Sequence, residues 1–75
     1  MAWTQQQLEK VILENDLWLL NQPGVNALSV VLDSAGLPCL EISTDGITPE
    51  TRRRVKERLK SVPLQFAHTG PINAF

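Results

Sequence analysis

Apolar residues recur three and four positions apart over residues 5–20, which is the spacing of an amphipathic helix. Thr4 and Gln7 have the spacing of a capping box, in which each side chain bonds the backbone N–H of the other residue. Pro23 and Gly24 end the helix. The helix then carries two apolar lines. The inward line is expected to hold Leu8, Val11, Ile12, Trp18 and Leu19, and the second line holds Leu13, Leu17 and Leu20.

Three later segments have the composition and alternation of β-strands. Residues 25–32 and 38–44 flank turn residues at 33–36 and are expected to form a hairpin. Residues 64–69 follow Pro63 and are expected to form the third strand. One face of the sheet is expected to stay open, and its side chains are those of Ala27, Ser29, Val31, Cys39, Glu41, Ser43, Gln65 and Ala67.

A second helix is predicted from residue 49 to about residue 60. Thr48 is a preferred N-cap residue and proline is favoured at the first helical position. Val55 and Leu59 lie four positions apart and form a narrow apolar stripe.

These elements predict one α+β domain over residues 1–75, in the order α-β-β-α-β. We expect a three-stranded antiparallel sheet with strand order 2-1-3 and both helices on one face. The first strand is placed in the centre because it is apolar on nearly both faces. The apolar residues of segment 72–75 are expected to lie back on the domain.

A chain of 75 residues buries a small core, so its stability is expected to be marginal unless a disulfide, a metal or oligomerisation adds to it. Cys39 is its one cysteine and His68 its one histidine, which rules out an internal disulfide and leaves a zinc site short of ligands. We expect no metal and no cofactor. Oligomerisation is the remaining source of further stability, and a homodimer or another protein partner is expected.

Residues 1–7 lack a basic signal-peptide region, and the apolar run 17–20 is too short for a signal sequence or a membrane span. The prediction is a cytoplasmic protein without membrane contact.

Cys39 and His68 would need to lie within hydrogen-bond reach to act as a catalytic dyad, but their strand positions point them to opposite faces. With no phosphate-binding glycine loop or nucleophile elbow either, no catalytic residue and no enzyme activity are expected.

Six of the seven cationic residues fall in the predicted second helix, between positions 52 and 60. Three interpretations stay open: a solvated face with Glu50–Arg54 and Arg53–Glu57 pairs, a surface for an acidic protein partner, or a nucleic-acid surface. A net charge of −1 and the absence of tyrosine speak against nucleic acid. The candidate interaction residues on this helix are Arg52, Arg53, Lys56 and Lys60.

The second apolar line of the first helix is the other candidate contact surface. Leu13, Leu17 and Leu20, together with Trp18, offer apolar area to a partner. The alternative is that segment 72–75 of the same chain covers it.

Turn and strand motifs spread over about two-thirds of the chain give a resemblance. They are Leu19-Leu20, Pro23-Gly24-Val25, Gly36-Leu37-Pro38, Thr48-Pro49-Glu50, Val62-Pro63-Leu64 and Thr69-Gly70-Pro71-Ile72-Asn73-Ala74. In these motifs the chain resembles a family of small bacterial α/β domains that occur alone or beside trypsin-like serine peptidases. The resemblance implies the fold and a regulatory setting, and it implies no reaction.

The function expected from the sequence is therefore a small, non-enzymatic protein-interaction or regulatory module that forms a homo-oligomer. A nucleic-acid-associated protein that uses residues 52–60 is the first alternative. An accessory domain linked to a serine peptidase is the second.

Overall fold

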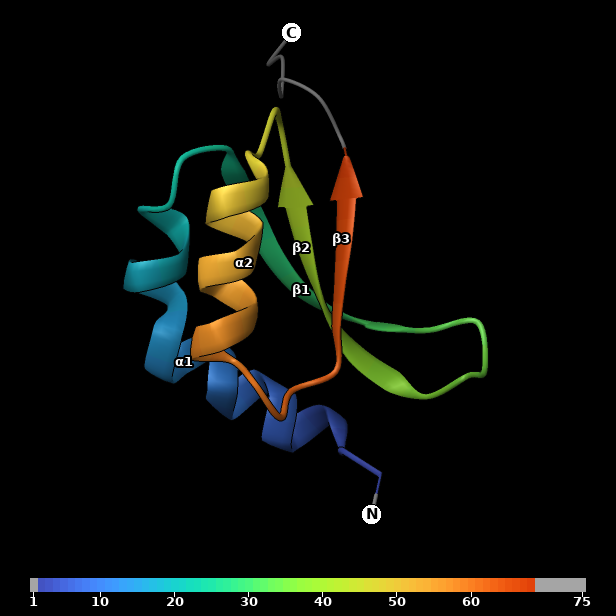
Figure 1. The fold of residues 1–75 in the computed structure, drawn as a ribbon. Helices are drawn as coiled ribbons and strands as arrows, with labels where there is room; N and C mark the ends of the chain where they lie inside the picture. The colour runs from blue at the N-terminus through green and yellow to red at the C-terminus, as the bar shows by residue number, and fades with distance from the viewer. Residues whose placement is uncertain (1, 69–75) are drawn as a thin grey trace, which may run out of the picture.

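The computed structural model describes residues 2–68 of the chain. Its elements are α1 (Gln5–Leu20), β1 (Val25–Leu32), β2 (Pro38–Thr44), α2 (Pro49–Arg58) and β3 (Leu64–His68) (Figure 1). The order and nearly all bounds confirm the prediction. Helix α2 ends two residues earlier than predicted because Leu59 leaves helical geometry, with φ −111° and ψ 46°. Residue 69 and segment 72–75, for which predictions were made, lie outside the described residues.

Both helices begin at the residues that the cap patterns predict. Thr4 accepts from the backbone N–H of Gln7 at 3.2 Å, and the Gln7 side chain accepts from the backbone N–H of Thr4 at 2.9 Å. Thr48 accepts from the backbone N–H of Thr51 at 3.2 Å, with Pro49 in the first turn. These bonds satisfy N–H groups that have no partner within a helix.

The sheet is mixed and has the order β1-β2-β3. Strand β1 pairs antiparallel with β2, and β2 pairs parallel with β3. The predicted antiparallel sheet of order 2-1-3 is therefore wrong. The central strand is β2, and β1 is an edge strand.

The position of α1 explains this order. Only residues 21–24 connect α1 to β1, so α1 must lie over β1, and it packs on β1 and β2. If β3 lay on the far side of β1, α2 would need the space that α1 occupies. Strand β1 is rich in apolar residues but is not buried on both faces, since Ser29 in its middle is exposed. Its apolar content therefore did not indicate a central position.

The core lies between the sheet and the two helices, which cover the same face (Figure 1). Leu40 and Ile42 of the central strand are fully buried, as predicted for the inward positions of β2. The buried hydrophobic cluster consists of Leu8, Leu19, Val25, Leu40, Ile42, Val55 and Leu59. Every element except β3 gives at least one residue to this cluster, while Leu64 and Phe66 of β3 pack against it half-buried.

The β1–β2 hairpin extends beyond the helices as an arm (Figure 1). Its turn is closed by a bond from the backbone N–H of Gly36 to Asp33 at 2.9 Å. Leu32 and Leu37 lie on this arm and are 68% and 50% exposed. Within residues 2–68 no helix has the length and apolarity needed to cross a bilayer.

Candidate functional site

The outer side of α1 carries the first candidate surface, which we name the leucine surface and define as Leu13, Leu17 and Leu20. These side chains are 76%, 78% and 47% exposed. Leu8 and Leu19 on the opposite side of the helix are fully buried. The second apolar line therefore has the exposure that the helix spacing predicts, and α1 exposes apolar area on the side away from its core contacts.

Trp18 does not share this exposure. It is half-buried, packs against the core and lies under the guanidinium of Arg58, whose central carbon is 4.4 Å from the ring centroid. The Nε of Arg58 also donates to Oδ1 of Asn15 at 3.0 Å. This contact between the helices was not predicted from the sequence. The polar Asn15 inside the inward apolar line is the signal that a polar partner was needed there.

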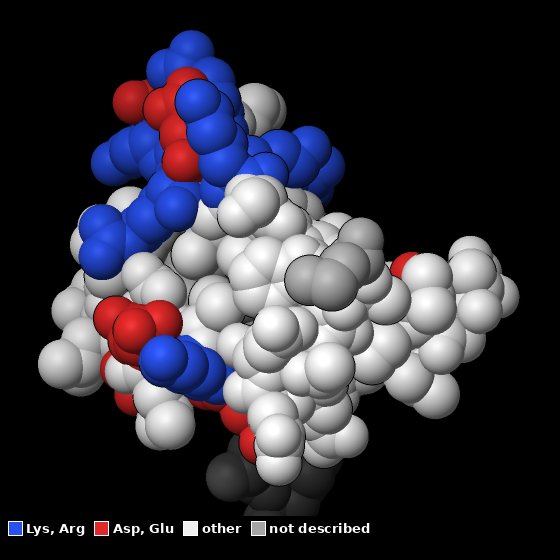
Figure 2. Space-filling view, turned by 90° about the horizontal axis from the view of Figure 1, so that it is seen from below, with Lys and Arg blue, Asp and Glu red and all other residues white. Residues whose placement is uncertain are grey.

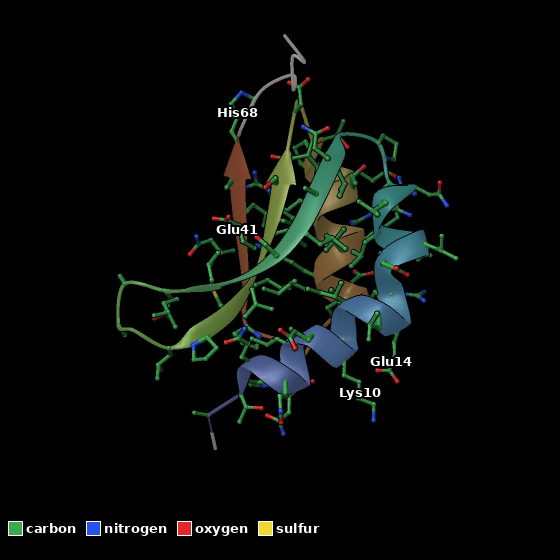
Figure 3. All side chains as sticks on the ribbon, turned by 180° about the vertical axis from the view of Figure 1, so that it is seen from behind. Lys10, Glu14, Glu41 and His68 are labelled. Carbon is green, nitrogen blue, oxygen red and sulfur yellow. The ribbon has the colours of Figure 1, made fainter. Side chains whose placement is uncertain are left out.

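The contact with Arg58 also fixes the direction of the leucine surface. Trp18 faces α2, and the three leucines lie about 100–160° further around α1. They point away from both α2 and the sheet. Lys10 and Glu14 lie on the same helix and also point away from the sheet (Figure 3).

The second candidate surface is a depression of about 360 Å³ on α2, which we name the basic pocket. Its lining residues are Ile47, Pro49, Arg52, Arg53 and Lys56. Lysine and arginine side chains gather over α2 at one end of the molecule (Figure 2). Three of the four predicted basic residues therefore meet in one site, while Lys60 is exposed beyond the end of α2. The lining by Ile47 and Pro49 was not predicted.

The cations of α2 differ in their partners. The guanidinium of Arg52 lies over the ring of Phe66, 5.1 Å from its centroid. Arg54 pairs with Glu50 at 3.7 Å, as predicted, and this is the one ion pair within residues 2–68. The predicted Arg53–Glu57 pair does not form. Arg53 and Lys56 therefore line the pocket with no carboxylate at ion-pair distance in the described chain.

Cys39 lies on the face of the sheet opposite the helices, yet it is only 3% exposed. Its thiol lies 3.9 Å from Oε1 of Gln65, and Gln65 donates to Glu41 at 2.9 Å. Burial raises the pKa of the Cys39 thiol, and the carboxylates of Asp33 and Glu41 raise it further. The thiol is therefore protonated at neutral pH and is a poor nucleophile.

His68 and Cys39 do not form a dyad. His68 pairs with Thr44 in the sheet, and Thr44 is five residues from Cys39 along β2, which separates the two by about 16 Å. His68 lies exposed at the end of β3, and Glu41 lies near the middle of the sheet (Figure 3). Within residues 2–68 no three His, Cys, Asp or Glu side chains lie close enough together to hold a metal ion.

Comparison of the chain with protein families, with curated proteins and with solved structures finds no match. The resemblance to small bacterial α/β domains therefore stays a prediction. The leucine surface and the basic pocket are the two features that bear most directly on function.

Proposed function

We propose that the protein is a small, non-enzymatic interaction module that forms a homodimer through the leucine surface. The observation that carries this proposal is the exposure of Leu13 and Leu17, at 76% and 78%. Apolar side chains grouped on one side of a helix, away from its own core, are typical of a contact surface.

The size of the leucine surface supports a weak dimer. Its exposed fractions add to about two fully exposed leucines, whose burial would contribute ~3–6 kcal/mol per protomer. Two protomers would together gain ~6–12 kcal/mol, against at least ~4 kcal/mol of lost translational and rotational freedom. The remainder is ~2–8 kcal/mol, and its midpoint of ~5 kcal/mol corresponds to a Kd of about 0.2 mM.

A second copy is the occupant that fits this surface best. It offers an apolar patch of the same size and shape, and a two-fold contact uses the same residues on both sides. The domain is also small and has no internal crosslink, since Cys39 is a free, buried thiol. A dimer would supply the stabilisation that so short a chain lacks.

The basic surface of α2 supports the acidic-partner alternative better than the nucleic-acid alternative. Base stacking needs open aromatic faces, while Arg52 covers Phe66 and Arg58 covers Trp18. A regulatory role beside a serine peptidase rests on the resemblance alone. We propose the cytoplasm as its location, since a lone free thiol suits a reducing compartment.

Site-directed crosslinking tests the proposal. Leu17→Cys in a Cys39→Ala background would place two thiols near the two-fold axis of the dimer, so a disulfide should form quickly under mild oxidation. Leu32→Cys in the same background is the matched control, because Leu32 is 68% exposed but lies on the hairpin arm. Equal rates of covalent dimer formation on non-reducing gels would refute a contact through α1.

A further inference from the structure

The basic pocket carries an inference that is independent of the dimer. We propose that it binds an acidic, extended peptide segment of a partner protein, with alternate aspartate or glutamate side chains engaging the cations of α2.

The charge of the pocket is the first argument. Its lining includes three cations and no carboxylate. Neither acid of α2 lines the pocket, and Glu50 pairs with Arg54 instead. Arg53 and Lys56 therefore have charge to offer to an outside anion, whereas Arg54 already has Glu50 as an exposed ion-pair partner.

The fixed position of Arg52 is the second argument. Its contact with the Phe66 ring, at 5.1 Å from the centroid, restricts a side chain that would otherwise lose conformational freedom on binding. Ile47 and Pro49 provide an apolar wall beside the cations. A guanidinium that is held in place next to apolar surface binds a carboxylate more tightly than a guanidinium that moves freely in water.

The spacing of the cations favours a peptide. Arg52 and Lys56 are four residues apart on one side of α2, which corresponds to about 6 Å along the helix axis. Side chains at positions i and i+2 of an extended peptide are about 7 Å apart. Two acids at alternate positions can therefore reach both cations, with Arg53 between them along the helix.

Fluorescence anisotropy tests the proposal. The probe is a fluorescein-labelled peptide of alternating glutamate and serine, measured with the full chain in about 150 mM salt. Arg53→Glu should weaken binding about tenfold or more, since it reverses a charge in the pocket. Arg54→Glu is the matched control because it makes the same charge change at the next residue, outside the pocket, and should weaken binding less than about threefold.

Two further probes sharpen the result. A peptide of the same composition with its glutamates in one block should bind more weakly than the alternating peptide, and an oligodeoxythymidine should also bind more weakly. Equal losses for Arg53→Glu and Arg54→Glu would mean that only the overall charge matters, which overturns the pocket. Tighter binding of the oligonucleotide would overturn the choice of a peptide. Neither outcome depends on whether the leucine surface forms a dimer.

Discussion

Arg58 lies over the indole ring of Trp18, with its guanidinium carbon 4.4 Å from the ring centroid, and so joins the end of α2 to α1. Its bond to Asn15 at 3.0 Å strengthens the same contact. Because Trp18 and Asn15 are held toward α2, the rotation of α1 about its own axis is fixed. This rotation leaves Leu13 and Leu17 outside.

Removal of this contact should destabilise the fold. We expect Arg58→Ala to lower the free energy of unfolding by ~1–2 kcal/mol, through loss of the cation–π contact and of one charge-assisted hydrogen bond. Urea unfolding followed by tryptophan fluorescence measures the change. Arg54→Ala removes only an exposed ion pair and should cost less than ~0.5 kcal/mol. Equal costs for the two variants would contradict the role given to Arg58.

Two glycines provide a matched pair. Gly24 and Gly36 both have positive φ, at +85° and +78°, so alanine is strained at either position by ~1–2 kcal/mol. A Cβ at Gly24 would also lie 3.0 Å from backbone atoms of Ile47, whereas a Cβ at Gly36 would meet nothing within 4 Å. Gly24→Ala should therefore lower the thermal midpoint clearly more than Gly36→Ala does. A larger loss at Gly36 would show that the contact between residue 24 and Ile47 is wrong.

The buried thiol predicts a pH dependence. The pKa of Cys39 in the folded chain lies above its ordinary value of 9.0. The unfolded chain thus loses this proton at lower pH than the folded chain does, and stability present below about pH 8 is lost as the pH rises toward and above 10.

Urea midpoints at about pH 8 and about pH 10 check this for the native chain and for Cys39→Ala. The native chain should lose more stability between the two pH values than the variant, which lacks the thiol. The same loss of stability in both proteins would mean that burial does not raise the pKa of the Cys39 thiol.

Local patterns predicted the elements of this fold well, and the capping box of Thr4 and Gln7 is an example. The order of the strands could not be predicted in the same way, because it depends on where the helices find room. The short connection from α1 to β1 places α1 over β1, which leaves β2 as the neighbour of β3. The prediction from apolar content alone wrongly placed β1 in the centre of the sheet.

The candidate surfaces were predictable to a similar extent. Helical spacing correctly separated Leu13 and Leu17 from the buried line, and placed Arg52 and Lys56 on one side of α2. Contacts between segments distant in sequence had little local signal, apart from the polar Asn15 that bonds Arg58. The burial of Cys39 on the outer face of the sheet is one such contact.

Sedimentation equilibrium of the full chain over a dilution series tests the central claim most directly. A monomer–dimer equilibrium with a Kd of about 0.2 mM is predicted, and Leu17→Ser should weaken it about tenfold or more. Leu37→Ser is the control, since Leu37 is 50% exposed on the hairpin arm and should leave the dimer intact. A native chain that stays monomeric at about 300 μM, or equal losses for the two variants, would contradict self-association through the leucine surface.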